Sequence, residues 1–192
     1  MIEKTYLSAQ EYLLDSFKLA NIILNSEWDP DDMIALWRGG APVGIIVHEF
    51  LYYHGFRPRH HILKCHSYTG IKSRNTEVVF ENADDIFNSI VPGSKVLIVD
   101  DIFDTGNTAK AVIKKLREFK ADVRFATVYW KPDQNQTALK PDFFVKESDK
   151  WIVFPHELDG LTPEEVQKKH PGIYDLLDLN KVNKNYQHED NH

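Results

Sequence analysis

The sequence predicts an α/β fold, a doubly wound and mostly parallel sheet flanked by helices. A short, continuously apolar run at 33–37 and mostly apolar runs at 95–99 and 123–130 are typical of strands that are buried on both faces. Between these runs, apolar residues recur at the spacing of an amphipathic helix. Strands that alternate with helices form a parallel sheet covered on both sides. We therefore expect the three runs to form the centre of such a sheet.

The length predicts one domain over residues 1–192, with a core at about 28–158 and a C-terminal extension at 159–192 whose polar end frays. Hydrophobic residues make up 42% of the chain, which is enough for a sizeable core. No run of eighteen apolar residues occurs, so no membrane span is expected. The N-terminal residues lack the basic-then-apolar order of a signal peptide.

Cys65 is the single cysteine, so an internal disulfide is excluded and a reducing cytoplasm is the expected compartment. Its apolar-alternating surroundings predict a buried bystander and not a nucleophile. The net charge of −6 argues against a general nucleic-acid binder, so neither nucleic acid nor membrane is an expected partner. Any anionic ligand must then be attracted by local groups, because the overall field repels it.

The N-terminal half begins with a capping-box pattern, Ser8 followed by Glu11. Apolar residues then follow at helical spacing, which predicts a helix at about 9–26. After the strand at 33–37, Pro42 suits the first turn of a helix that Gly55 ends. The remaining elements expected here are a strand at 61–66, a polar loop at 67–75 and a short strand at 77–80.

In the C-terminal half, the strand at 95–99 is followed by a helix with one apolar face. The residues predicted to place that face on the core are Ala109, Val112, Ile113, Leu116 and Phe119. Shorter strands are expected at 142–145 and 152–154, and short helices from Thr162 and over 172–179.

Residues 95–108, KVLIVDDIFDTGNT, predict a binding site for a phosphorylated ribose. Asp100 and Asp101 lie at the carboxyl edge of the sheet, where open parallel sheets bind ligands. Ribose hydroxyls or Mg²⁺ would offset the repulsion between the two carboxylates. The next turn leads into a helix N-terminus, which favours an anion. The predicted phosphate-binding residues are Thr105, Gly106, Asn107 and Thr108.

Spacing alone leaves other interpretations open. A paired aspartate after an apolar strand also occurs in receiver domains, where it binds Mg²⁺, and Asp104–Thr108 can be no more than a helix cap. Arg38-Gly39-Gly40 follows the first strand and should lie at the same edge, where glycines let amides approach an anion. A strand-to-helix turn often needs glycine anyway. Beside the ribose site, however, this segment is predicted to bind a diphosphate.

Two further residues point to a planar base. Lys131 ends the third central strand and donates hydrogen bonds without accepting any, so it can read a carbonyl oxygen but not the amino group of adenine. The plane of Trp151 suits a flat heterocycle. The alternatives are a surface lysine at a strand end and a core tryptophan at a strand start.

VLIVDDIFDTGNTAKAV resembles the phosphoribosyl diphosphate motif of the type I phosphoribosyltransferases. Together with Ser67-Tyr68, Lys131-Pro132 and the segment 151–157, it resembles the 6-oxopurine enzymes, of the xanthine–guanine or hypoxanthine type, over about 30–158. The resemblance implies that Asp100 and Asp101 bind the ribose and that 104–108 holds the 5′-phosphate. It also implies that Lys131 contacts the 6-oxo group, that Trp151 stacks on the purine, and that Ile152 presents its backbone to the base.

The same resemblance implies an activity, the transfer of 5-phosphoribose from phosphoribosyl diphosphate to hypoxanthine, guanine or xanthine in purine salvage. It implies a small hood for the base and a homodimer or homotetramer. Mg²⁺ is the expected cofactor, with Asp100 and Asp101 as its ligands, and Glu157 either reaches the ion through water or is a surface carboxylate. A mobile loop with Ser67 and Tyr68 would close the site, and the Trp37–Arg38 peptide would be cis. His156 departs from the expected tryptophan, which bears on the preference among purines.

Asp104 is the candidate general base, because it lies between the ribose and phosphate subsites, although it can equally act by positioning the loop. Lys131 is the second candidate catalytic residue. Two other functions fit part of the sequence. One is a pyrimidine or orotate phosphoribosyltransferase. The other is a non-catalytic regulator that senses phosphoribosyl diphosphate and binds nucleic acid through Arg57, Arg59, His60 and His61.

Overall fold

The computed structural model describes residues 4–69, 76–81, 83–179 and 181. It contains two compact units, which are described separately. The larger unit comprises Gln10–Asp149, and the smaller one combines the N-terminal segment up to Ala9 with the chain from Lys150 onward. Within the described part of the chain, no helix is long and apolar enough to cross a membrane.

The larger unit is built on a six-stranded sheet with the order β4-β3-β2-β5-β6-β7. All neighbouring strands are parallel except β3 and β4. This arrangement confirms the predicted α/β class with a mostly parallel sheet. The strands are β2 (Asp32–Trp37), β3 (Arg59–Thr69), β4 (Thr76–Glu81), β5 (Lys95–Phe103), β6 (Asp122–Trp130) and β7 (Phe143–Glu147).

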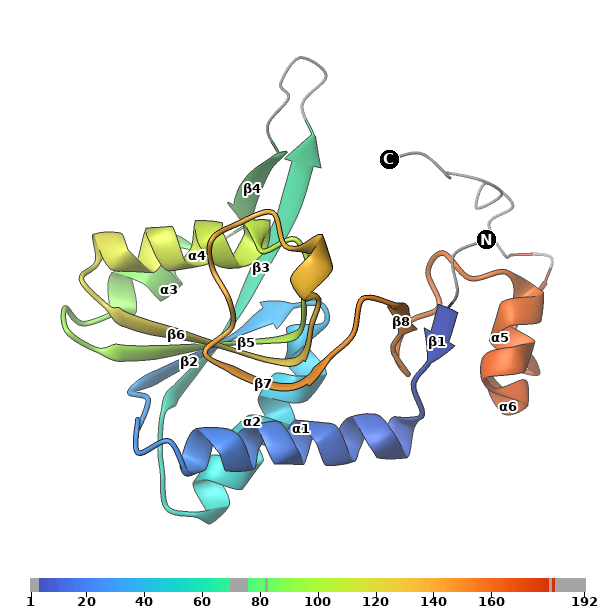
Figure 1. Cartoon of the computed structure of the whole chain (residues 1–192), viewed down its shortest axis with the longest axis horizontal. Helices are drawn as coiled ribbons and strands as arrows, with labels where there is room; N and C mark the ends of the chain where they lie inside the picture. Colours follow the sequence, from blue (N-terminus) through green and yellow to red (C-terminus); the bar gives the residue numbers. More distant parts are fainter. Residues whose placement is uncertain (1–3, 70–75, 82, 180, 182–192) are drawn as a thin grey trace. The chain divides into compact units, whose positions relative to one another are not determined.

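Helices cover both faces of this sheet, as a doubly wound fold requires (Figure 1). On one face lie α1 (Ala9–Leu24) and α2 (Gly40–Tyr53), and on the other lie α3 (Asp84–Ser89) and α4 (Asn107–Glu118) (Figure 1). A 3₁₀ turn, η1 (Pro132–Gln134), follows β6. Sequence analysis missed α3, because six residues are too few to display helical periodicity.

Alternating strand residues supply the two faces of the core. Ile34 and Leu36 of β2 pack in the cluster that includes Val112 and Leu116 of α4, which confirms the predicted apolar face of that helix. On the opposite face, Ala35 lies so close to α2 that a Cβ on Gly44 would come within 2.6 Å of its methyl group. The close approach explains the glycine in the middle of that helix.

The smaller unit contains a parallel pair of short strands, β1 (Lys4–Tyr6) and β8 (Trp151–Val153). The strand predicted at 152–154 is therefore present, but its partner is an N-terminal strand that was not predicted. α5 (Pro163–Lys169) starts with a capping box in which Thr162 and Glu165 each accept a hydrogen bond from the other's backbone N–H. α6 (Pro171–Tyr174) is shorter than the helix predicted over 172–179.

Two sequence predictions about the strands are wrong in their boundaries. β5 continues through Asp100 and Asp101 to Phe103, so the acidic pair lies within the strand and not beyond it. The segment 67–69 belongs to β3 and not to a loop, because β4 provides an antiparallel partner for its backbone. The rest of that predicted loop, 70–75, and the polar end at 182–192 lie outside the described residues.

Candidate active site

The loop after β2 lies against the acidic pair of β5, because these two strands are parallel neighbours. The Trp37–Arg38 peptide is cis, as predicted. A Cβ on Gly39 would overlap the carboxylate of Asp101, and one on Gly40 would overlap the main-chain carbonyl of Val99. The backbone of this loop thus comes closer to the carboxylates than any residue with a side chain would allow.

The carboxylates of Asp100 and Asp101 repel each other. Burial and the charge of Asp101 raise the pKa of Asp100 well above its usual value, while backbone N–H groups of Asp101 and Gly40 act against the shift. The N–H of Asp101 donates to Oδ1 of Asp100 over 3.0 Å, and Asp101 is only 6% exposed. A cation or hydroxyl donors would relieve the repulsion, and a phosphorylated ribose with Mg²⁺ supplies both.

The residues at this edge suit Mg²⁺, which needs few protein ligands, better than a metal ion that is coordinated by protein side chains alone. Among the described residues, no group of three or more His, Cys, Asp or Glu side chains gathers into a metal site. Mg²⁺ commonly binds through one or two carboxylates and keeps several waters, which suits the Asp100–Asp101 pair. Glu157 belongs to the smaller unit, where its Oε2 accepts a hydrogen bond from the N–H of Phe154 over 2.9 Å. Its role as a metal ligand stays a prediction.

The turn after β5 exposes the start of α4. Gly106 has φ +78°, and a Cβ there would lie 2.6 Å from the hydroxyl of Thr137. The N–H of Gln136 donates to the carbonyl of Thr105 over 2.9 Å, and the Asn107 side chain donates to that of Gln136 over 3.3 Å. A segment after β6 therefore supports the turn, which sequence analysis missed because 135–137 carries no motif. Gly106 at the N-cap has no side chain that could cap α4, and the N–H of Asn107 makes only a long contact of 3.4 Å with Oγ1 of Thr105, so the amides of this first turn suit an anion.

Lys131 and Asp104 form an ion pair that the sequence did not predict. Nζ of Lys131 lies 2.9 Å from Oδ2 of Asp104. Lys131 is 8% exposed, so the surface-lysine interpretation is wrong, whereas the Asp104 side chain is 44% exposed. The N–H of Lys131 also donates to the carbonyl of Phe103 over 2.9 Å, which ties the lysine to the end of β5. The two candidate catalytic side chains therefore interact directly.

The remaining predicted residues occupy several settings. Trp151 is half exposed, so it is not a core tryptophan, and the side chain of Ile152 is buried within the smaller unit. Ser67 and Tyr68 lie in β3, opposite Val78 and Glu77 of β4, and their side chains are outside the described part.

Cys65 is partly buried, whereas the sequence predicted a buried residue. Burial, with a smaller contribution from the charge of Asp100, raises the pKa of its thiol to about 11. A thiol with such a pKa is a poor nucleophile at neutral pH, which agrees with the bystander interpretation.

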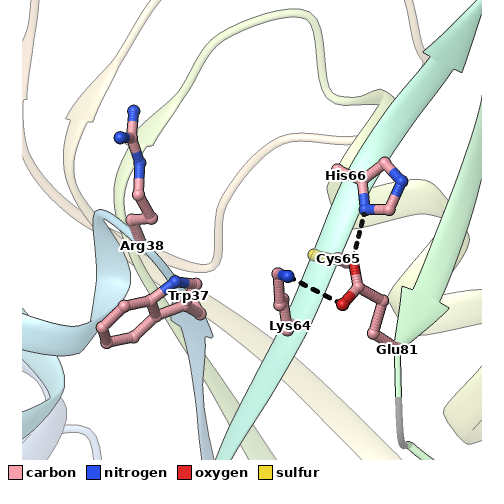
Figure 2. A pocket seen from close by; sticks show the side chains of 6 residues that line it. All are labelled: Trp37, Arg38, Lys64, Cys65, His66 and Glu81. Carbon is pink, nitrogen blue, oxygen red and sulfur yellow. Dashed lines mark hydrogen bonds and ion pairs between the residues drawn. The ribbon is translucent and has the colours of Figure 1, made fainter. Parts of the chain in front are cut away.

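A pocket of about 520 Å³ opens beside the Arg38–Gly40 loop (Figure 2). Sequence analysis missed three charged residues in it, Lys64, His66 and Glu81. The available signal was the alternation of β3, which brings 64 and 66 to one face of a strand that ends at the ligand-binding edge. The residues lining the pocket are Trp37, Arg38, Lys64, Cys65, His66 and Glu81.

Comparison with known proteins identifies relatives of this arrangement. Residues 4–160 match the phosphoribosyl transferase domain. A curated xanthine-guanine phosphoribosyltransferase of Chromohalobacter salexigens is 41% identical over 68 residues, which make up 34% of this chain and 38% of that protein. The alignment thus spans well under half of the curated relative.

Solved structures match over more of the chain. A purine phosphoribosyltransferase of Pyrococcus horikoshii is 26% identical with a TM-score of 0.65, covering 84% of this chain and 98% of that one. A xanthine-guanine-hypoxanthine phosphoribosyltransferase of Helicobacter pylori is 25% identical with a TM-score of 0.64, covering 82% and 96%. A Neisseria gonorrhoeae protein with bound ppGpp shares the fold at 23% identity, a TM-score of 0.72, and coverage of 90% and 98%.

Proposed function

Because the chain belongs to the phosphoribosyl transferase domain family, we propose that it is a purine salvage enzyme. It transfers 5-phosphoribose from phosphoribosyl diphosphate to hypoxanthine, guanine or xanthine, and it releases diphosphate and the nucleoside 5′-monophosphate. One observation carries the proposal. The backbone of Gly39 and Gly40 lies against the Asp100–Asp101 pair, so groups suited to diphosphate and to ribose meet at one sheet edge.

The donor is held in three parts. Arg38, Gly39 and Gly40 bind the diphosphate through a cation and closely approaching amides. Asp100 and Asp101 would accept hydrogen bonds from the ribose hydroxyls and would hold Mg²⁺, with Glu157 as the further predicted ligand. When bound, Mg²⁺ stabilises the negative charge that develops on the leaving diphosphate. The start of α4 binds the 5′-phosphate through its amides and dipole, together with the residues Thr105, Gly106, Asn107 and Thr108.

The base is read by Lys131, Trp151 and Ile152. Lys131 donates to the 6-oxo group with one of its three N–H groups, and we infer that its contact with Asp104 is exchanged for the carbonyl oxygen as it does so. Trp151 provides a half-exposed aromatic plane for stacking, and Ile152 contributes backbone groups. Once Lys131 turns to the base, Asp104 becomes available to accept a proton from the purine as bond formation proceeds at an oxocarbenium-like anomeric carbon.

The alternative of a nucleic-acid-binding regulator has little support, because its basic cluster is engaged within the fold. Arg59 and His61 both contact the buried carboxylate of Asp32, over 2.7 and 3.1 Å. Arg57 donates to the carbonyls of Tyr52 and Phe56. A pyrimidine or orotate substrate is disfavoured by the purine specificity in the names of the relatives at 25% identity or more.

One assay tests the function. The full chain is incubated with Mg²⁺, phosphoribosyl diphosphate and, in parallel, hypoxanthine, guanine, xanthine, adenine, uracil or orotate, and nucleotide formation is measured. We expect turnover with at least one 6-oxopurine and none with adenine. Turnover of adenine alone would contradict the role of Lys131, turnover of orotate or uracil alone would assign a pyrimidine enzyme, and salt-sensitive RNA binding without turnover would favour a regulator.

We further propose that the protein works in the cytoplasm as a homodimer or homotetramer. Light scattering coupled to size-exclusion chromatography measures the assembly directly. A monomer at assay concentration would contradict it.

A further inference from the structure

The pocket beside the Arg38–Gly40 loop contains charged residues that the proposed function does not yet use. It lies where β2 approaches its carboxyl end, since Trp37 of β2 is the register partner of Lys64 of β3. Its volume of about 520 Å³ is large enough for a polyphosphate group. In Figure 2, Trp37 and Arg38 form one side of the pocket, and Lys64, His66 and Glu81 form the other.

One carboxylate holds two nitrogen donors in this pocket. Oε2 of Glu81 lies 2.7 Å from Nζ of Lys64, and Oε1 lies 3.2 Å from Nδ1 of His66 (Figure 2). Arg38 adds a further cation to the lining. The cations Lys64 and Arg38 and the nitrogen donors of His66 thus share a lining with the single carboxylate of Glu81, although the whole chain carries −6. Such a local excess attracts an anion.

A purely structural explanation covers only part of this arrangement. Lys64 and Glu81 are direct register partners on the antiparallel strands β3 and β4, and an opposite-charge pair of that kind favours strand pairing. The side chains are 53% and 36% exposed, however, and exposed pairs contribute little to stability. Strand pairing also does not explain why His66 and Arg38 line the same cavity.

The pocket is connected to the ribose-binding edge. Cys65, between Lys64 and His66 in β3, also lines the pocket. The charge of Asp100 contributes to the raised pKa of its thiol. Arg38 begins the loop whose glycines lie against Asp101. An anion that extends from the Asp100–Asp101 pair along the loop would therefore enter this pocket.

We propose that Lys64 and His66 bind the diphosphate of the donor, and that Glu81 is a built-in competitor that holds them until the diphosphate displaces it. This inference rests on the proposed function, because it assigns residues to the same site. A diphosphate carries more charge and more acceptor oxygens than one carboxylate, so it can replace Glu81 at both donors. Glu81 thereby lowers the affinity for diphosphate, which favours release of the product.

The test measures binding of inorganic diphosphate to the full chain with Mg²⁺, by titration calorimetry. We expect Lys64→Met to weaken binding about tenfold, the scale of one lost charge-assisted contact, with a smaller loss for His66→Gln. Glu81→Gln should tighten binding by a few-fold, because it releases both donors. Lys115→Met is the matched control, since Lys115 is a similarly exposed lysine paired with Glu118 over 2.8 Å. Its affinity should equal that of the wild type.

A gain of affinity in Glu81→Gln separates this proposal from a structural role, which would lower stability without tightening any ligand. Unchanged diphosphate affinity in all three pocket variants would overturn the proposal. Turnover assays of the same variants keep the two proposals distinct. Normal turnover with unchanged diphosphate binding removes only this inference, whereas Lys64-dependent binding without turnover of any base removes only the proposed reaction.

Discussion

Nζ of Lys131 lies 2.9 Å from Oδ2 of Asp104, in a pair whose lysine is buried and whose aspartate is 44% exposed. Each residue directly follows a different strand, and the parallel pairing of β5 with β6 brings the ends of those strands together. Asp104 compensates the charge of the buried lysine, which would otherwise be costly. The carbonyl oxygen of a bound purine is neutral, so it can stabilise the charge of Lys131 only in part. The pair therefore couples base recognition to the release of a carboxylate.

Lys131→Met should lower kcat/KM for hypoxanthine and guanine by roughly tenfold to a hundredfold, the equivalent of one hydrogen bond to a charged group at about 1.5–3 kcal/mol. The loss should appear mainly in KM for the base, while KM for the donor stays close to wild type. Steady-state kinetics with each substrate varied in turn measures both. Asp104→Asn provides the comparison, because it keeps a partner for Lys131 but cannot accept a proton. If it retained wild-type kcat across pH, Asp104 would not be a general base.

Gly39→Ala should weaken productive donor binding, because the added methyl group would overlap the carboxylate of Asp101. We expect KM for phosphoribosyl diphosphate to rise at least about tenfold, as suits a displaced catalytic loop. Gly93→Ala is the control. It adds strain at φ +88° of about 1–2 kcal/mol but meets nothing within 4 Å, so it should lower the urea midpoint and leave KM unchanged. Equal KM values in both variants would contradict the close packing of the loop.

Lys146→Met should make folding stability less sensitive to acid. Burial works to raise the pKa of Asp15, but hydrogen bonds and charges of Lys146 and Lys18 outweigh it and lower that pKa below its usual value. Ionised Asp15 therefore stabilises the fold at pH values above the unfolded pKa of about 3.9, and this contribution disappears as pH falls through the lower folded pKa.

The variant should lose roughly 1–3 kcal/mol at pH 7, a value reduced by solvent because the Lys146 side chain is 36% exposed. Its stability difference from the wild type should shrink below about pH 4. Urea unfolding at a series of pH values measures the effect. A difference that stays constant down to pH 2 would show that the pair does not control the acid response.

Cys65 should react slowly with a thiol-specific disulfide reagent at pH 7.5. Burial raises the pKa of its thiol to about 11, so little thiolate exists at that pH. The rate should increase with pH up to that value, and the chain unfolded in urea should react much faster. Rapid reaction of the folded protein at neutral pH would contradict the burial and the raised pKa.

Most of the central architecture was predictable from local patterns. The apolar runs at 33–37, 95–99 and 123–130 correspond to β2, β5 and β6, and Asp104–Thr108 leads into α4 as expected. Hydrophobic periodicity reports burial directly, which is why these elements were found. The six-residue α3 and the strand β1 were missed, since neither is long enough to show a period.

The sequence by itself determined which residue types stand at the ends of the strands, and with them the predicted phosphoribosyl site at residues 95–108 and Arg38–Gly40. Only the tertiary structure decided which of those residues touch. The contact of Lys131 with Asp104, the support of Gly106 by Thr137, and the pocket shared by β2, β3 and β4 all join residues from different elements. Such contacts depend on strand order and register, and a periodic pattern along one segment carries no information about the segment that will lie beside it.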